Sequence, residues 1–193
     1  MCAAAALTLP AHAQSNISGP DPFANCTADH AGQQDGTVYP GATVEPWVDV
    51  NPLAAGNLIA GWQQDRWDNG GARSLMSAYT KNGGKSWTRV VVPGISLCSG
   101  GSYERATDPW VTIARDGAAY QMALGFSGQE STPSSISAML VVRSGDGGLT
   151  WGAPTTLIRD VGATFFNDKN MVIADPQDAR YVYAVWGRLL ADG

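Results

Sequence analysis

The stretch SGDGGLTW, from Ser144 to Trp151, decides the fold expected for this chain, because a looser copy, TKNGGKSW, runs from Thr80 to Trp87. In these copies the side chain of Asp146 or Asn82 can accept hydrogen bonds from nearby backbone N–H groups and close a tight turn. A glycine pair follows, which tolerates positive φ. The tryptophan that ends each copy is expected to bury its ring between neighbouring sheets. We therefore expect a structural turn that is used twice.

A longer unit repeats around these turns. EPWVDV begins at Glu45, DPWVTI at Asp108 and a weaker copy, DKNMVIADP, at Asp168. A second apolar run follows each of them, and in the first two copies a third run, the glycine turn and a fourth run come next. Short runs rich in Val, Ile, Tyr and Trp that recur in fours at a long period are typical of propeller blades. We predict an all-β fold, an incomplete β-propeller of about two and a half four-stranded antiparallel blades. The blades are expected at 43–104, 105–160 and 161–193, the last of them incomplete.

Composition supports this class and excludes others. The chain has 193 residues, 44% of them hydrophobic and only 15% charged, with 23 glycines, which suits short strands and one core. A net charge of −5 without a basic stripe argues against nucleic acid as a partner. The chain contains no apolar run of about 18 residues, so no membrane span is predicted. The sequence also lacks a phosphate loop and any Cys/His metal spacing, so we expect no cofactor and no metal.

The beginning of the chain resembles an export signal. Residues 1–13, MCAAAALTLPAHA, have a short apolar core and end in the small-x-small pattern Ala11-His-Ala13. They lack a basic start, so we interpret them as the tail of a signal peptide whose beginning is missing. The alternative is an Ala-rich terminus without a targeting role. The mature protein would be secreted or periplasmic, and residues 14–42 would form an N-terminal arm.

Two cysteines remain once the signal is removed. Cys26 and Cys98 form an even pair in an exported chain, which predicts a disulfide between the arm and the loop after the first repeat. The alternative is two buried free thiols.

The repeated turn resembles the Asp box, Ser-x-Asp-x-Gly-x-Thr-Trp. The second copy matches every defined position, and the first keeps the glycine and the tryptophan but has Asn for Asp. The matching residues are Asn82, Gly84, Trp87, Ser144, Asp146, Gly148, Thr150 and Trp151. Together with EPWVDVNP, GWQQDRW and YERATDPWV, these boxes resemble bacterial secreted sialidase-like proteins of the sialidase (neuraminidase) superfamily, from about Tyr39 onward. The resemblance implies a six-bladed propeller, of which this chain would be the N-terminal piece, with the later blades as its partner. The Asp box also occurs in sortilin-type receptors and other proteins, so it indicates the fold more than the activity.

The resemblance implies a site at the mouth of the propeller channel. Sialidases grip the substrate carboxylate with three arginines, use an Asp as acid/base, and have a Tyr nucleophile assisted by Glu. Arg66 and its later echo Arg188 fit one arginine position, and Arg105 precedes an inner strand. The catalytic Asp of sialidases lies in the loop after the second strand, at the channel mouth, where Asp65 and Asp68 are the candidates. The Tyr and Glu would come from later blades.

The sequence departs from the family at one important place. Where sialidases have Arg-Ile-Pro, this chain has Glu45-Pro46-Trp47, and an acid there repels a carboxylate, unless the first blade here is the family's second. Glu45, Asp108 and Asp168 recur at blade spacing. They are expected either to face the channel as substrate or metal ligands or to anchor loop N–H groups. Arg66 alternatively stacks on a neighbouring tryptophan.

Three functions therefore remain open. The first is a sialidase-type glycoside hydrolase that is inactive as this piece alone. The second is a non-catalytic propeller that binds glycans or proteins, and the third is a hydrolase that uses two carboxylates on neutral polysaccharides. Carbohydrate is the expected ligand in the first and third cases, and a later-blade Tyr–Glu pair distinguishes the first from the others.

Overall fold

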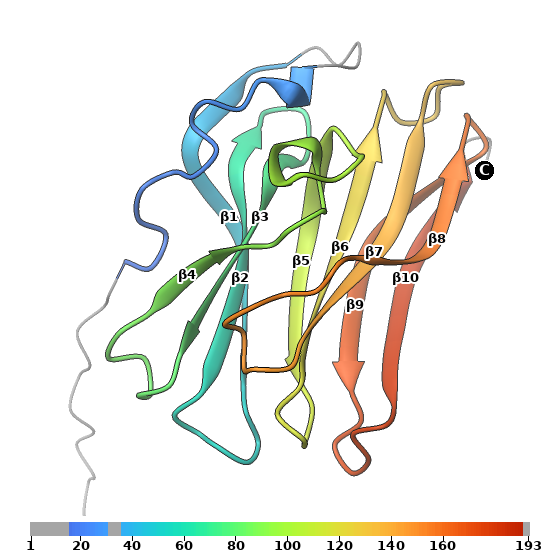
Figure 1. The fold of residues 1–193 in the computed structure, drawn as a ribbon. Coiled ribbons are helices and arrows are strands. Elements are labelled where there is room, and N and C mark those ends of the chain that lie inside the picture. The colour runs from blue at the N-terminus through green and yellow to red at the C-terminus, as the bar shows by residue number, and fades with distance from the viewer. Residues whose placement is uncertain (1–15, 31–35, 191–193) are drawn as a thin grey trace, which may run out of the picture.

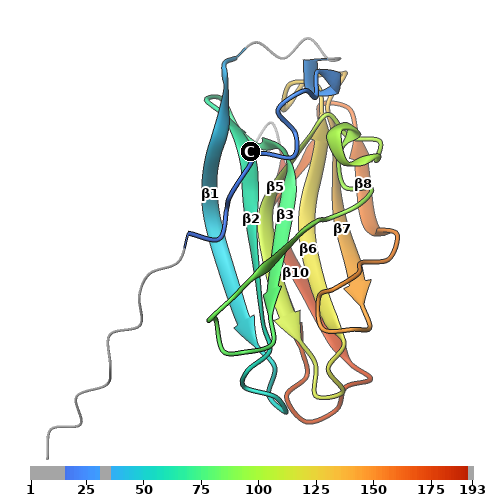
Figure 2. The same cartoon turned by 60° about the vertical axis from the view of Figure 1, so that its left-hand side comes forward.

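The computed structural model describes residues 16–30 and 36–190, and almost all of their regular structure is β-strand (Figure 1). The strands are β1 (Val38–Val50), β2 (Leu58–Trp67), β3 (Ala72–Thr80), β4 (Thr88–Val91), β5 (Arg105–Ile113), β6 (Ala119–Ser127), β7 (Ile136–Ser144), β8 (Thr155–Val161), β9 (Phe165–Ala174) and β10 (Val182–Leu190). Two short 3-10 helices, η1 (Ala28–His30) and η2 (Leu97–Ser99), lie at the upper end of the molecule in Figures 1 and 2. Residues 1–13, expected to be a signal, lie outside the described residues. Among the described residues, no helix is long and apolar enough to cross a membrane.

The strands group into repeated antiparallel units. In blade 1, β1 pairs with β2, β2 with β3 and β3 with β4; in blade 2, β5 to β8 pair in the same order. The third unit is the hairpin of β9 and β10. Blades 1 and 2 are joined in the backbone ladder by a single residue pair, Ala72 and Ala106, so they are separate sheets in all but this contact. The fold is an all-β, incomplete propeller, and Figure 1 shows its units following one another from blue to red.

Apolar side chains fill the spaces between successive units. The core between blades 1 and 2 includes Ile59, Leu75, Val111, Leu140 and Trp151. The core between blade 2 and the third unit includes Met122, Leu124, Met139, Phe166 and Val172. Because blade 2 is covered on both faces, its strands read as nearly continuous apolar runs rather than as alternating ones.

Each inner strand contains a β-bulge at the same place. The ladders of β1, β5 and β9 skip between Val44 and Trp47, between Thr107 and Trp110 and between Asp168 and Met171. In each bulge one residue that is not glycine has positive φ, at 52° in Glu45, 54° in Asp108 and 51° in Lys169. The structural equivalent of Glu45 and Asp108 is therefore Lys169, and the repeat predicted from the sequence, with Asp168 as the third member, is displaced by one residue.

The repeated turn closes through its own side chains. In the second copy Asp146 accepts hydrogen bonds from the backbone N–H of Thr150 (2.9 Å) and from its hydroxyl (2.6 Å), and these bonds lower the pKa of Asp146 to about 2. The hydroxyl of Ser144 accepts a bond from the N–H of Gly148, at 2.9 Å, where φ is +94°. In the first copy Asn82 accepts a bond from the Ser86 N–H, at 3.0 Å. Both turns thus use the side chain at the third position as the acceptor.

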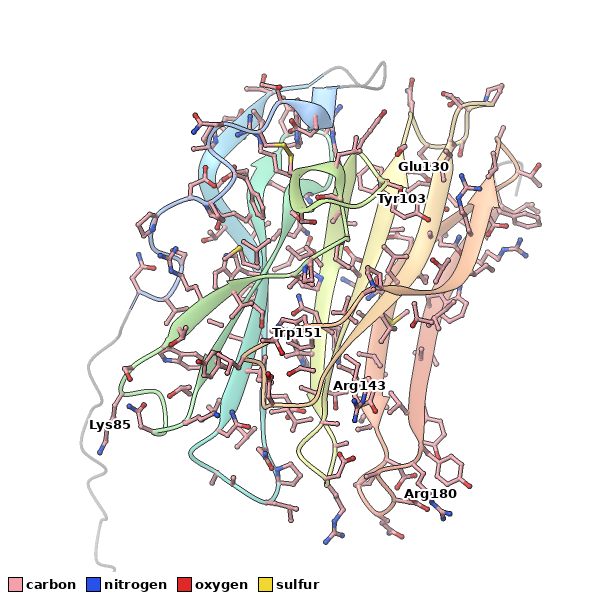
Figure 3. All side chains as sticks on the ribbon, viewed as in Figure 1. Lys85, Tyr103, Glu130, Arg143, Trp151 and Arg180 are labelled. Atoms are coloured by element: carbon pink, nitrogen blue, oxygen red, sulfur yellow. A yellow bond between two sulfur atoms is a disulfide. The ribbon has the colours of Figure 1, made fainter. Side chains whose placement is uncertain are left out.

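The two tryptophans of the turns have different surroundings. Trp151 is buried in the core between blades 1 and 2, at the middle of the molecule in Figure 3. Trp87 was expected to fill an equivalent place, but it packs in a separate cluster with Phe23, Trp62 and Met76, because the N-terminal segment covers this face of blade 1. A disulfide between Cys26 and Cys98, with an S–S distance of 2.04 Å, ties that segment to η2.

Candidate functional site

A cleft of about 730 Å³ opens where the two blades and the third unit meet. Its walls come from the three bulges, the turn between β2 and β3 and the loop between β6 and β7. The polar lining consists of Glu45, Arg66, Asn69, Thr107, Asp108, Gln129, Glu130, Ser131, Asp168 and Lys169, and the apolar lining includes Leu124, Phe126 and Phe166. Glu130, one of the lining residues, lies near the upper end of the molecule in Figure 3, while Lys85, in the first glycine turn, lies at the opposite end.

A buried glutamine joins two of the cleft acids. Gln63 in β2 is fully buried, and its Nε2 donates hydrogen bonds to Glu45 Oε2 and to Thr107 Oγ1 (2.8 Å). The Thr107 hydroxyl donates in turn to Asp108 Oδ1, at 2.8 Å. Arg66 Nη1 donates to Gln63 Oε1, at 2.7 Å. Carboxylates of two neighbouring blades are therefore linked by one chain of hydrogen bonds that also orients Arg66.

Gln63 was not among the residues that the sequence singled out. Its only signal was a polar pair, Gln63-Gln64, directly after the apolar start of the run LIAGWQQDRW. Polar residues inside a strand that is buried on both faces must find partners, so such a pair marks a buried network.

Asp108 also holds the next unit in place. Its Oδ2 accepts a hydrogen bond from the backbone N–H of Lys169, at 3.1 Å, and its carbonyl accepts one from Asn170 Nδ2, at 2.9 Å. Asp168 Oδ1 accepts from the same Lys169 N–H, at 2.8 Å. The acid of blade 2 thus lines the cleft and also anchors the bulge of β9.

Acidic side chains outnumber basic ones in the cleft. Four of the lining residues are acidic and two, Arg66 and Lys169, are basic. The potential in such a cleft disfavours anionic ligands and favours neutral or cationic ones.

The two acids predicted to be catalytic lie outside the cleft. Asp65 is fully buried within β2 at φ +64°, where it accepts bonds from the Gly41 N–H (2.8 Å) and from Arg73 Nη1 (3.4 Å). Asp68 is exposed and accepts a bond from the Thr37 N–H, at 2.9 Å. Neither residue belongs to the cleft lining, because β2 continues to Trp67 and presents Asp65 away from the cleft. The prediction that Asp65 lies in a loop at the channel mouth is therefore wrong.

Two of the three predicted arginines also lie elsewhere. Arg188 is exposed, pairs with Asp160 at 2.7 Å, and lies 3.7 Å over the ring of Phe165. This pairing lowers the pKa of Asp160. Arg105 is fully buried behind the cleft wall, with its guanidinium 3.9 Å over the ring of Trp67. The stacking on tryptophan that was considered for Arg66 thus belongs to Arg105. Arg66 is the predicted arginine that lines the cleft.

One group of possible metal ligands comes together in the described part of the chain. It consists of Cys26, Asp29 and Cys98, and its two sulfurs are joined to each other. Since thiolates, not disulfides, bind metal ions, this group is a covalent link and not a metal centre.

Comparison with known proteins agrees with this architecture. No family model matches the chain, and no curated protein sequence matches it. Among solved structures, the Hadza microbial sialidase Hz136 superposes with a TM-score of 0.53 at 18% identity, covering 69% of this chain. The same match covers 30% of the sialidase, so this chain spans less than a third of that protein's length. A protein of unknown function from Dyadobacter fermentans DSM 18053 gives a TM-score of 0.44 at 19% identity, over 63% of this chain and 39% of the other. At 18% identity the first likeness shows a sialidase-like fold.

Proposed function

We propose that the cleft binds a saccharide and that this chain is the acid-bearing part of a glycoside hydrolase with a sialidase-like propeller. The observation that carries this proposal is the pair Glu45 and Asp108, placed on equivalent bulges of neighbouring blades and linked through Gln63 and Thr107. Most glycoside hydrolases place two carboxyl groups on either side of the scissile bond. The disulfide is in keeping with an exported protein, since such bonds persist in oxidising compartments.

The two acids are suited to different tasks. Asp108 already uses both carboxylate oxygens on protein donors, Thr107 and Lys169. Glu45 is exposed in the cleft and is held from behind by Gln63. We assign the contact with sugar hydroxyls to Glu45, and we assign to Asp108, held by Thr107 and the Lys169 N–H, the role of the second carboxyl group of the pair.

The balance of charge favours a neutral saccharide. A sialoside carries a carboxylate, which the four acids of the cleft would repel. A sialidase-type reaction is the second candidate, and what favours it is the presence of Arg66 and Lys169 in the lining, since both could pair with a substrate carboxylate.

Binding and hydrolysis assays on the same samples test the proposal. Cellohexaose, xylohexaose, mannohexaose and 3′-sialyllactose are titrated into the protein by calorimetry, and reducing ends are measured after incubation. We expect binding of at least one neutral hexasaccharide, weakened tenfold or more in Glu45→Gln. Lys85→Gln, at the opposite end of the molecule, is the control and keeps wild-type affinity.

The outcomes separate the candidates. Selective binding of 3′-sialyllactose that is lost in Arg66→Met would favour the sialidase reaction. Absence of binding for all four saccharides would refute the proposed function.

A further inference from the structure

Arg105 has no part in the hydrogen-bond chain of the cleft acids, yet it contacts residues that form the cleft wall. It is the first residue of β5, is fully buried, and lies opposite Phe126 in the ladder of β5 and β6. Phe126 lines the cleft, whereas Arg105 does not. The guanidinium therefore lies behind the wall and does not face the ligand.

Within residues 16–30 and 36–190, the hydrogen bonds and the ring contact of this guanidinium go to one segment. Nη1 donates to Asn69 Oδ1 (2.7 Å) and to the carbonyl of Gly70 (3.0 Å), and the ring of Trp67 lies 3.9 Å from the guanidinium carbon. Trp67 is the last residue of β2, and Asn69 and Gly70 belong to the turn that follows it. Asn69, Gly70 and Gly71 form part of the cleft wall. Arg105 thus connects the inner strand of blade 2 to a wall that belongs to blade 1.

The turn has two backbone hydrogen bonds of its own, from the Trp67 N–H to the Gly71 carbonyl (2.9 Å) and from the Gly70 N–H to the Trp67 carbonyl (3.4 Å), but neither uses the Gly70 carbonyl. Gly70 and Gly71 have φ values of +119° and +68°, and two adjacent glycines restrict the backbone little. Nothing lies within 4 Å of the place where a Cβ of Gly70 would be, so packing does not hold that residue. At Gly71 the contact is close, since a Cβ would come within 2.6 Å of the Phe126 ring. The two bonds from Arg105 fix the part of the turn that packing leaves free.

Burial of the Arg105 guanidinium is energetically unfavourable. Desolvation lowers the pKa of its guanidinium to about 10, and the buried Nε and Nη2 have no hydrogen-bond partner among the described residues. Burying a charged group opposes folding unless its hydrogen bonds compensate for the lost hydration. A general stabilising role is thus a weak explanation for it, and a requirement for one geometry of the wall is a better one.

We propose that Arg105 is a positioning residue that holds the Asn69–Gly71 wall of the cleft in its saccharide-binding shape without touching the saccharide. The effect on saccharide binding rests on the proposed function, but the positioning of the wall by Arg105 can be observed without ligand.

Two variants at Arg105 test it in the whole chain. Arg105→Met removes the donors and keeps the apolar stem, while Arg105→Lys keeps a charged donor that can reach the turn. In Arg105→Met we expect the amide signals of Asn69, Gly70 and Gly71 to shift and broaden in ¹H–¹⁵N spectra, and the Kd for the hexasaccharide that wild type binds to rise tenfold or more. In Arg105→Lys the amide signals should return toward their wild-type positions and the Kd should lie within about threefold of the wild-type value, because an ammonium can still donate to Gly70. Arg188→Met, which removes an arginine that stacks on Phe165 outside the cleft, is the matched control and changes neither.

A second variant guards against misfolding of Arg105→Met. Gly70→Ala strains the turn through its positive φ while leaving Arg105 in place, and it is expected to raise the same Kd. A folded Arg105→Met protein with wild-type turn signals and affinity would overturn the inference. If wild type binds none of the saccharides, the proposed function fails, and the turn signals alone still decide whether Arg105 positions the wall.

Discussion

The carboxylate of Asp49 in β1 accepts a hydrogen bond from the backbone N–H of Ile113 in β5, at 2.8 Å. The same contact recurs one unit later, where the Thr112 hydroxyl accepts from the N–H of Ala174, at 3.2 Å. Asp49 and Thr112 follow the bulge residues Glu45 and Asp108 at the same interval. Side chains of the inner strands thus connect successive units by hydrogen bonds where no backbone ladder joins these strands.

Removal of the hydrogen bond between Asp49 and the Ile113 N–H should destabilise the protein. In Asp49→Ala the buried N–H of Ile113 loses its acceptor, so we expect a loss of about 1–3 kcal/mol in the free energy of unfolding, measured by urea titration. Asp49→Asn retains an oxygen acceptor and should lose less. Glu130→Ala, which removes an exposed loop acid, should leave the midpoint unchanged. Equal stability of Asp49→Ala and wild type would show that solvent replaces the carboxylate.

The second glycine turn should make stability depend on acid. The pKa of Asp146 is lowered to about 2 in the folded protein, against 3.8 for an ordinary Asp. A lowered pKa contributes stability above the unfolded value, and this contribution is lost as the pH falls from about 4 to about 2. Asp146→Asn removes the titration, and the first turn shows that the amide is tolerated, because Asn82 Nδ2 donates to Ser86 Oγ at 2.8 Å. Thermal midpoints at pH 5, 3 and 2 should therefore fall less steeply in Asp146→Asn than in wild type, and parallel curves would contradict this.

The disulfide should contribute much of the stability of the covered face of blade 1. Cys26 and Cys98 are separated by 72 residues, and loop-closure entropy for such a link corresponds to about 4 kcal/mol. We expect the double variant Cys26→Ser/Cys98→Ser to unfold at lower denaturant concentration than wild type. Chymotrypsin should also cleave it after Phe23, in the N-terminal segment, faster than it cleaves wild type. Arg89→Ala gives a useful comparison, because it removes only hydrogen bonds, those from its guanidinium to the carbonyls of Ser18 and Pro20. If reduction leaves both measurements unchanged, the disulfide adds nothing to the non-covalent contacts that hold this segment.

The hydrogen bonds of buried Gln63, and not its volume, should be what ligand binding in the cleft requires. Gln63→Met keeps the volume but removes the donors to Glu45 and Thr107, so we expect at least a tenfold rise in the Kd for the saccharide that wild type binds. Gln121→Met is a matched control, since Gln121 is also fully buried and its amide has no hydrogen-bond partner among the described residues. Calorimetric titration of both variants checks this. Similar affinity of Gln63→Met and wild type would remove the hydrogen-bond chain from the proposed site.

The architecture could be predicted from the sequence because the repeated turn acts locally. Its acceptor side chain, glycines and tryptophan determine a hairpin without reference to the rest of the chain, and the spacing of the copies then defines the units. The cleft acids Glu45 and Asp108 could be found by the same spacing, whereas Asp168 lies one residue before the repeat position, which Lys169 occupies. Each of them lines the cleft.

The errors concern side chains whose partners are distant in sequence. The resemblance to sialidases predicts Asp65 in a loop after the second strand, yet Asp65 is buried in β2 and accepts hydrogen bonds from Gly41 and Arg73. Arg105 was expected to face a ligand, but its partners Asn69 and Gly70 belong to another blade. A charged residue gives no indication in the sequence of whether solvent, a ligand or a second sheet surrounds it.

The bulges of the inner strands have a practical consequence for engineering this protein. Glu45, Asp108 and Lys169 occupy left-handed backbone conformations in which glycine is unstrained, and a residue with a side chain costs about 1–2 kcal/mol there. Replacing Lys169 by glycine should therefore raise heat tolerance while removing a charge from the cleft. At Glu45 and Asp108 the same gain is opposed by the loss of their hydrogen bonds with Gln63, Thr107 and the Lys169 N–H. Variants selected only for thermal robustness would be expected to acquire glycine at position 169 and to lose recognition as they do so.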